Sequence, residues 1–97
     1  MKRRRYLVSY DIREPRRLKA VHAAMKGYGY RLQYSVFVCD LHESEKLDLR
    51  LDLGGLMNRV EDQVCLIDLG PLAENPAWRF EFMGPPSALP ETGPRVL

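Results

Sequence analysis

The sequence predicts an α+β protein with a ferredoxin-like βαββαβ sandwich and an additional short C-terminal strand. Its 97 residues, 45% of them hydrophobic, suit one compact domain. Strand-like and helix-like patterns alternate in the order of this fold, with both helices expected on one face of the sheet. Several strand segments carry large apolar side chains on both sides, so we expect the second face to be covered by self-association.

The first strand and the first helix lie in residues 3–29. Residues 3–12 alternate in polarity as a strand does, and the strand is expected to stop near Asp11. Glu14-Pro15 gives a helix start, because proline is tolerated at the first helical position. The apolar face of the helix has i, i+3, i+4, i+7 spacing, and two glycines end it: Leu18, Val21, His22 and Met25, then Gly27 and Gly29.

The middle of the chain predicts a strand region and a second helix. Residues 30–41 are rich in β-branched and aromatic side chains, and form either one long strand or two short ones bent near Tyr34-Ser35. Ser44 is the expected N-cap of the second helix. Five leucines give that helix a wide apolar surface: Leu47, Leu49, Leu51, Leu53 and Leu56.

The remaining segments complete the sheet and leave a tail. Residues 63–69 form a third strand region, closed by Gly70-Pro71, and residues 79–83 form a short strand. We expect residues 1–84 to be the domain, and 85–97, with four prolines and no periodicity, to be an irregular or partner-docked tail. Cys39 and Cys65 occur singly in strands, which predicts reduced, buried thiols.

The charges are distributed unevenly along the chain. Residues 1–31 contain ten Lys/Arg and two Asp/Glu, whereas residues 32–97 contain five and eleven. A basic region of this kind indicates either a phosphate-binding surface or a solvated face of mixed charge. No apolar run approaches the roughly 20 residues that span a bilayer, so we expect a cytoplasmic protein without a membrane partner.

Asp11 is the candidate for catalytic chemistry. This carboxylate ends a strand and precedes Arg13, Arg16 and Arg17, so it is placed to hold a divalent cation while the arginines hold phosphate oxygens. One carboxylate is a small ligand set for Mg²⁺, and a two-fold dimer would supply a second. In the alternative interpretation, Asp11 caps the turn into the helix through hydrogen bonds to its own backbone.

Five motifs, in this order and spacing, resemble the CRISPR-associated protein two family over about residues 4–84. They are Tyr10-Asp11-Ile12, Arg16-Arg17-Leu18, Gly27-Tyr28-Gly29, Gln33-Tyr34-Ser35-Val36-Phe37, and Asp62-Gln63-Val64 with Asp68-Leu69-Gly70. The resemblance implies a ferredoxin-like homodimer. It implies that Asp11 is the metal ligand, and that nucleic acid is bound by Tyr10, Arg16, Arg17, Arg31, Ser35 and Phe37. The arginines after Asp11 add Arg13 to these nucleic-acid-binding positions.

Two functions follow from the resemblance. One is spacer acquisition, in which the homodimer binds duplex DNA and bridges dimers of the CRISPR integrase subunit, CRISPR-associated protein one. The other is a Mg²⁺-dependent endonuclease acting on DNA or single-stranded RNA, in which Mg²⁺ shared by two Asp11 carboxylates activates water. A toxin-like endoribonuclease that works without the integrase is the alternative to both. His22 follows the apolar spacing of the first helix and is expected to be a core or half-buried histidine, not a catalytic one.

Overall fold

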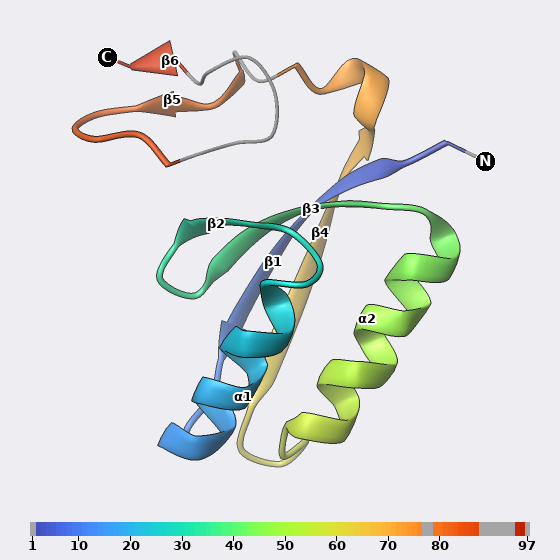
Figure 1. The fold of residues 1–97 in the computed structure, drawn as a ribbon, viewed down its shortest axis with the longest axis vertical. Helices are drawn as coiled ribbons and strands as arrows, with labels where there is room; N and C mark the ends of the chain where they lie inside the picture. The colour runs from blue at the N-terminus through green and yellow to red at the C-terminus, as the bar shows by residue number, and fades with distance from the viewer. Residues whose placement is uncertain (1, 77–78, 88–94, 97) are drawn as a thin grey trace.

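The computed structural model describes residues 2–76, 79–87 and 95–96, and contains the predicted ferredoxin-like arrangement (Figure 1). Four strands form one antiparallel sheet in the order β2-β3-β1-β4. The bounds are β1 Arg4–Asp11, β2 Tyr30–Gln33, β3 Val36–Leu41 and β4 Gln63–Pro71. The two central strands, β1 and β3, are the ones that contain buried residues, whereas the edge strands β2 and β4 are exposed or partly exposed.

Helices α1 (Pro15–Met25) and α2 (Glu43–Leu56) cover one face of this sheet (Figure 1). α1 begins where the sequence predicted, because the Glu14 carboxylate accepts hydrogen bonds from the backbone N–H groups of Arg16 and Arg17 at 3.0 and 2.8 Å. The predicted N-cap of α2 was wrong. His42 occupies that position, and its backbone N–H donates to the Glu45 carboxylate at 2.9 Å, so Ser44 lies inside the first turn.

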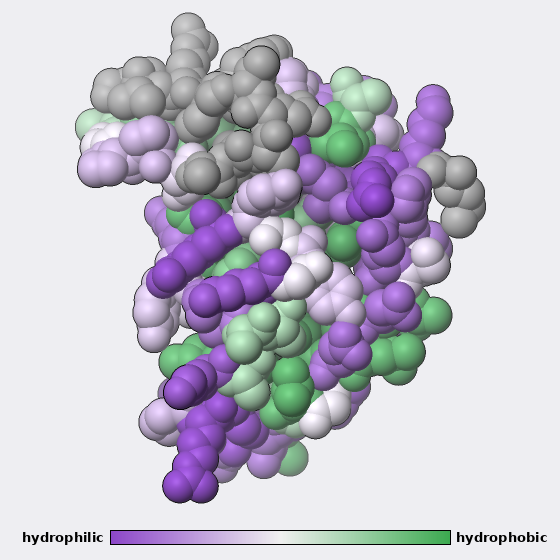
Figure 2. Space-filling view, in the orientation of Figure 1, coloured by the Kyte–Doolittle hydropathy of each residue, from purple (hydrophilic) through white to green (hydrophobic). Residues whose placement is uncertain are grey.

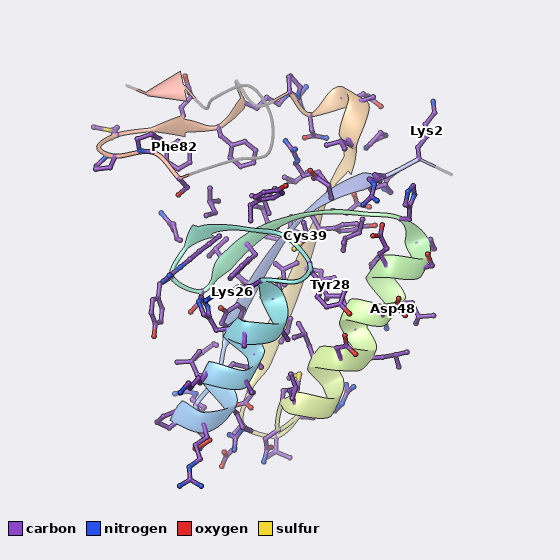
Figure 3. The ribbon with its side chains drawn as sticks, in the orientation of Figure 1. Lys2, Lys26, Tyr28, Cys39, Asp48 and Phe82 are labelled. Carbon is purple, nitrogen blue, oxygen red and sulfur yellow. The ribbon has the colours of Figure 1, made fainter. Side chains whose placement is uncertain are left out.

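The core lies between the helices and the face of the sheet that they cover. Its fully buried members include Val8, Val21, Met25 and Leu49, together with Cys39, which Figure 3 labels at the sheet. Only some of the leucines predicted to form the apolar surface of α2 pack in the core. Leu49 and Leu53 are buried, whereas Leu47 and Leu51 are 55% and 66% exposed, because a helix offers only one stripe to a sheet.

The region 30–41 consists of two short strands. β2 and β3 pair through a turn at Tyr34-Ser35, which decides between the two predicted arrangements. The turn reaches the end of β1, since the backbone N–H of Tyr10 donates to the Ser35 carbonyl at 3.1 Å. The β2–β3 hairpin and the end of β1 are thereby held side by side.

The C-terminal segment turns back over the other face of the sheet. After the 3₁₀ turn η1 (Leu72–Glu74), β5 (Glu81–Phe82) pairs in parallel with β6 (Arg95–Val96). The strand expected at 79–83 is thus shortened to two residues, and part of the tail expected to be irregular forms β6. Residues 88–94 and 97 of that tail lie outside the described residues.

This segment covers one end of the sheet and leaves the other end open. Arg5 is 2% exposed, donates to the Asn75 carbonyl at 2.8 Å and lies 5.6 Å from the centre of the Phe80 ring. Val38, on the same face, is fully buried. At the opposite end of β1 the face is more accessible, and the prediction that Cys65 is buried was wrong: its thiol is exposed on β4, opposite Ser9 of β1.

No helix among the described residues is long and apolar enough to cross a membrane.

Candidate nucleic-acid interface and acidic site

Asp11 lies at the last position of β1, on the face of the sheet that the helices do not cover. It pairs across the ladder with Gln63 of β4, and strand alternation puts it on the same face as Leu7 and Ser9. Its side chain is 68% exposed. The Arg13 guanidinium, 69% exposed, approaches the carboxylate to 4.0 Å, which is the only side-chain contact given for Asp11 in the described part of the chain.

The helix-capping interpretation of Asp11 does not match the observed contacts. The carboxylate that caps α1 belongs to Glu14, and the two backbone hydrogen bonds lower the pKa of that side chain. Asp62, not Asp11, accepts from the backbone N–H of Arg13 at 2.9 Å. Apart from its 4.0 Å contact with Arg13, the exposed Asp11 carboxylate is therefore accessible to solvent or a ligand.

A single chain offers one half of a metal site at most. No cluster of three or more His, Cys, Asp or Glu side chains able to hold a metal is present among the described residues. An exposed carboxylate with free oxygens suits Mg²⁺, which usually keeps several waters and takes one or two carboxylates. Asp11 is the residue that could hold such an ion, provided that a second chain or a substrate phosphate completes the ligand set.

Arg17, one of the two predicted phosphate-binding arginines at the helix start, is engaged inside the protein. Its Nε donates to the Asp62 carboxylate at 2.8 Å, and its Nη2 donates to Glu61 at 2.9 Å. The Asp62 side chain is fully buried and also accepts from the backbone N–H of Asn58 at 2.8 Å. The Arg17 guanidinium, with these backbone donors, holds the pKa of Asp62 well below its usual range.

This arrangement makes Arg17 a clamp between the start of α1 and the loop before β4. Sequence reasoning missed the role of Asp62, although the residue stood within one of the family motifs. The sequence shows only that an aspartate precedes the apolar strand β4. Such a side chain is either solvated or paired, and the contact with Arg17 in the structure shows that it is paired.

Arg16 is placed differently from its neighbour. Its side chain is exposed, and it forms no side-chain hydrogen bond or ion pair with the described part of the chain. Arg13 and Lys19 are exposed at the same end of α1. Figure 2 shows strongly hydrophilic side chains over this end of the molecule, where α1 begins in Figure 1. These three cations define what we call the α1 basic patch: Arg13, Arg16 and Lys19.

Tyr10 and Phe37, two predicted nucleic-acid contacts, are buried in the core at 5% and 1% exposure. Their rings stack with centroids 6.3 Å apart, and the Tyr10 hydroxyl is 2.8 Å from His22 Nδ1. Burial lowers the pKa of His22, and the tautomer of the imidazole determines which of the two groups donates this hydrogen bond. Direct contact of either ring with nucleic acid is disfavoured, because both rings are buried in the core.

The remaining predicted positions lie in the β2–β3 hairpin. Arg31 is exposed, and its guanidinium lies 5.3 Å from the centre of the Tyr34 ring. Ser35, partly buried in the turn, uses its carbonyl to hold Tyr10. The roles of these residues in nucleic-acid binding stay predictions, as does that of Asp11 in catalysis.

The fold neutralises much of the charge asymmetry in the sequence. Arg4 pairs with Asp68 at 3.1 Å, and Arg5 with Asp40 at 2.8 Å. Arg3 and Arg17 also pair with carboxylates. Basic side chains from the first third of the chain thus meet acids from the rest, and the exposed cations that remain beside α1 include Arg16, Lys19 and Arg31.

These observations agree with the comparison with known proteins. The family model described as CRISPR associated protein Cas2 matches residues 4–73. The chain belongs to the Cas2 family. This is the family that the sequence motifs indicated, and the matched residues include all four strands of the main sheet.

Cas2 relatives are similar over most of the chain. A protein of Rhodospirillum rubrum named CRISPR-associated endoribonuclease Cas2 1 is 40% identical over 79 residues, which cover 81% of this chain and 76% of the relative. CRISPR-associated endoribonuclease Cas2 of Geobacter sulfurreducens is 43% identical over 70 residues, covering 72% of this chain and 73% of the relative.

Solved structures share the fold. Streptococcus pyogenes Cas2 aligns with a TM-score of 0.67 at 30% identity, covering 77% of this chain and 90% of that one. A hypothetical protein of Thermus thermophilus aligns with a TM-score of 0.68 at 34% identity, covering 69% of this chain and 82% of that one. The ferredoxin-like architecture predicted from the sequence is therefore confirmed for this Cas2 family member.

Proposed function

We propose that the protein is a homodimeric nucleic-acid-binding subunit of CRISPR spacer acquisition, with an endonuclease activity that depends on Mg²⁺ and on Asp11. The observation that carries the proposal is the exposed Asp11 carboxylate on the open face of the sheet, next to the α1 basic patch. Its support is family membership, together with relatives named CRISPR-associated endoribonucleases.

The open face favours self-association. Ile67 is 47% exposed there, and Leu7, Val36 and Cys65 contribute further apolar surface on the same side. Apolar surface of this kind is stabilised when a partner covers it. Because a two-fold interface uses the same surface of both subunits, a dimer across this face near its Asp11 end would place two Asp11 carboxylates on opposite sides of the axis.

Two carboxylates brought together repel each other, and a divalent cation relieves that repulsion. Mg²⁺, when bound, supplies Lewis-acid polarisation of a phosphate and a more acidic water. The chain itself would supply Asp11 as the ligand, and Arg13 and Arg16 as cations for phosphate oxygens. Duplex DNA suits these groups best, because they contact a phosphate backbone without reading bases.

Bridging of integrase dimers belongs to the same proposal. A subunit of a bridging complex needs surface for its partner beyond the DNA contacts, and Leu47 and Leu51 of α2 leave apolar side chains exposed away from Asp11. The alternative is a toxin-like metal-dependent endoribonuclease acting without the integrase. It is favoured by the names of the relatives and would arrest growth when the protein is expressed alone.

The test compares wild type with Asp11→Asn, each first shown to have the same oligomeric state. Labelled duplex DNA and single-stranded RNA are incubated with and without Mg²⁺, and Asp48→Asn, which changes an exposed carboxylate of α2 (Figure 3), is the matched carboxylate control. Cleavage that needs Mg²⁺ and is lost only in Asp11→Asn supports the nuclease. If the wild type cuts neither substrate, the nuclease activity is refuted. Spacer integration with the purified integrase then tests the scaffold role.

The exposed thiol of Cys65 provides a separate test of the proposed dimer interface. Cys65 lies on the face that we propose to be covered, so a thiol reagent should label it slowly at protein concentrations where the dimer forms, and faster after dilution. Labelling that is fast and independent of protein concentration would show that the dimer uses another surface.

A further inference from the structure

A second surface lies between α1 and the β2–β3 hairpin, on the side of the sheet opposite Asp11. It is a groove of about 350 Å³ lined by Pro15, Leu18, Lys19, His22, Arg31 and Tyr34. Arg31 pairs with Phe37 across β2 and β3, so strand geometry puts its side chain on the helix-covered side. Asp11 is on the other side, and the groove is therefore distinct from the acidic site.

The groove has an aromatic wall that is exposed. The Tyr34 side chain is in the hairpin turn, and the residue is 67% exposed. The His22 ring is nearly parallel to it, with an interplanar angle of 18° and centroids 6.5 Å apart. His22 is fixed in turn by the hydrogen bond between its Nδ1 and the buried Tyr10 hydroxyl, so one wall of the groove is attached to the core.

The two rings suit a flat aromatic ligand. Tyr34 is 67% exposed and nearly parallel to His22, with centroids 6.5 Å apart, so the pair presents an aromatic surface on which a base can stack.

The charges at the groove rim match phosphate. Lys19 is exposed on α1, and Arg31 lies over the Tyr34 ring at 5.3 Å. Within the described part of the chain, no acidic side chain lines the groove. A ligand that combines a flat apolar ring with flanking negative charge therefore fits both parts of the surface, and a nucleotide within a strand has this composition.

We propose that this groove binds one unpaired base of a single-stranded nucleic acid, stacked on Tyr34 against His22, with Lys19 and Arg31 contacting the flanking phosphates. The proposal rests on the proposed nucleic-acid-binding function and deepens it. The α1 basic patch continues into the groove through Lys19, so a duplex held by the patch could place an unpaired end or a displaced base at Tyr34.

The experiment measures binding of four oligonucleotides by the full-length protein: single-stranded DNA and single-stranded RNA carrying one 2-aminopurine, an abasic single strand of equal length, and a blunt duplex. The variants are Tyr34→Ala, Tyr34→Phe and Tyr30→Ala. Tyr30 is the matched control, because it is a tyrosine of the same hairpin, 44% exposed, that pairs with Val38 on the other side of β2.

Wild type should quench 2-aminopurine and bind the strand with bases more tightly than the abasic strand. Tyr34→Ala should weaken binding of that strand by about 5- to 150-fold, the range expected for loss of one stacked base, and should abolish the quenching. Tyr34→Phe and Tyr30→Ala should stay within about twofold of wild type. The DNA and RNA strands show which sugar the groove prefers.

Failure of the groove and failure of the general function give different results. If wild type binds the duplex but Tyr34→Ala binds the single strand as well as wild type does, the groove proposal is overturned and the proposed function stands. Equal affinity of wild type for base-containing and abasic strands also overturns it. If wild type binds none of the four oligonucleotides, nucleic-acid binding itself is refuted.

Discussion

Arg16 and Arg17 are adjacent and chemically identical, yet the structure predicts opposite consequences for their removal. Arg16 is exposed and without a given side-chain partner among the described residues, whereas Arg17 pairs with Glu61 and the buried Asp62. We expect Arg16→Ala to weaken DNA binding and to leave the fold intact, and Arg17→Ala to destabilise the fold.

The magnitude follows from counterion release. Each phosphate neutralised by a cation contributes about −0.9 to the slope of log K against log salt, so one Arg16 in each subunit of a dimer contributes about −1.8. Between 50 and 200 mM salt, the wild type should therefore lose about 12-fold more affinity than Arg16→Ala does. The unfolding free energy of Arg16→Ala should change by less than about 0.5 kcal/mol, as for other surface positions.

The assay is fluorescence anisotropy with a labelled duplex at four salt concentrations, combined with thermal unfolding of each variant. Arg50→Ala is the matched control, since it removes an exposed arginine from α2. Its slope should equal that of wild type. The reasoning is refuted if Arg17→Ala keeps the thermal stability of wild type while losing as much slope as Arg16→Ala, because Arg17 would then be a DNA contact and not a clamp.

Three further predictions concern stability and reactivity. Arg5→Ala should lower the unfolding free energy by about 3–5 kcal/mol, because it leaves the Asp40 carboxylate without its partner. Measured by urea unfolding, the double variant Arg5→Met/Asp40→Leu should recover most of this loss. If it recovers none, the ion-pair explanation is wrong. Stability should fall as the pH drops below about 5, because the pKa of Asp62 is lowered in the folded state and the unfolded chain therefore binds the proton first. In urea unfolding from pH 3 to 7, the midpoint should decline less steeply for Asp62→Asn than for wild type. An equal decline would exclude Asp62 as the cause. In the native protein only Cys65 should react with a thiol reagent at pH 8, because burial raises the pKa of Cys39 to about 12, and labelling of both thiols would show local opening of β3.

The sequence by itself determined the order of the elements and the identity of the family. Alternating apolar residues, the Glu14-Pro15 helix start and the glycines after α1 depend on neighbours within a few positions, so local pattern was sufficient for them. The N-cap of α2 was misplaced because Ser44 and His42 both precede the apolar run, and the contact between the His42 backbone and Glu45 selected the earlier start.

Only the tertiary structure decided which charges and rings remain available. Arg16 and Arg17 look alike in sequence, but only Arg17 pairs with Asp62, which lies 45 residues further along the chain. Strand alternation puts Tyr10 and Asp11 on opposite faces, but packing of α1 determines that Tyr10 is the buried one. Pairing across the sheet and between distant loops is not encoded in local spacing, and for that reason the exposed carboxylate, the basic patch and the aromatic groove became distinguishable only once the chain was folded.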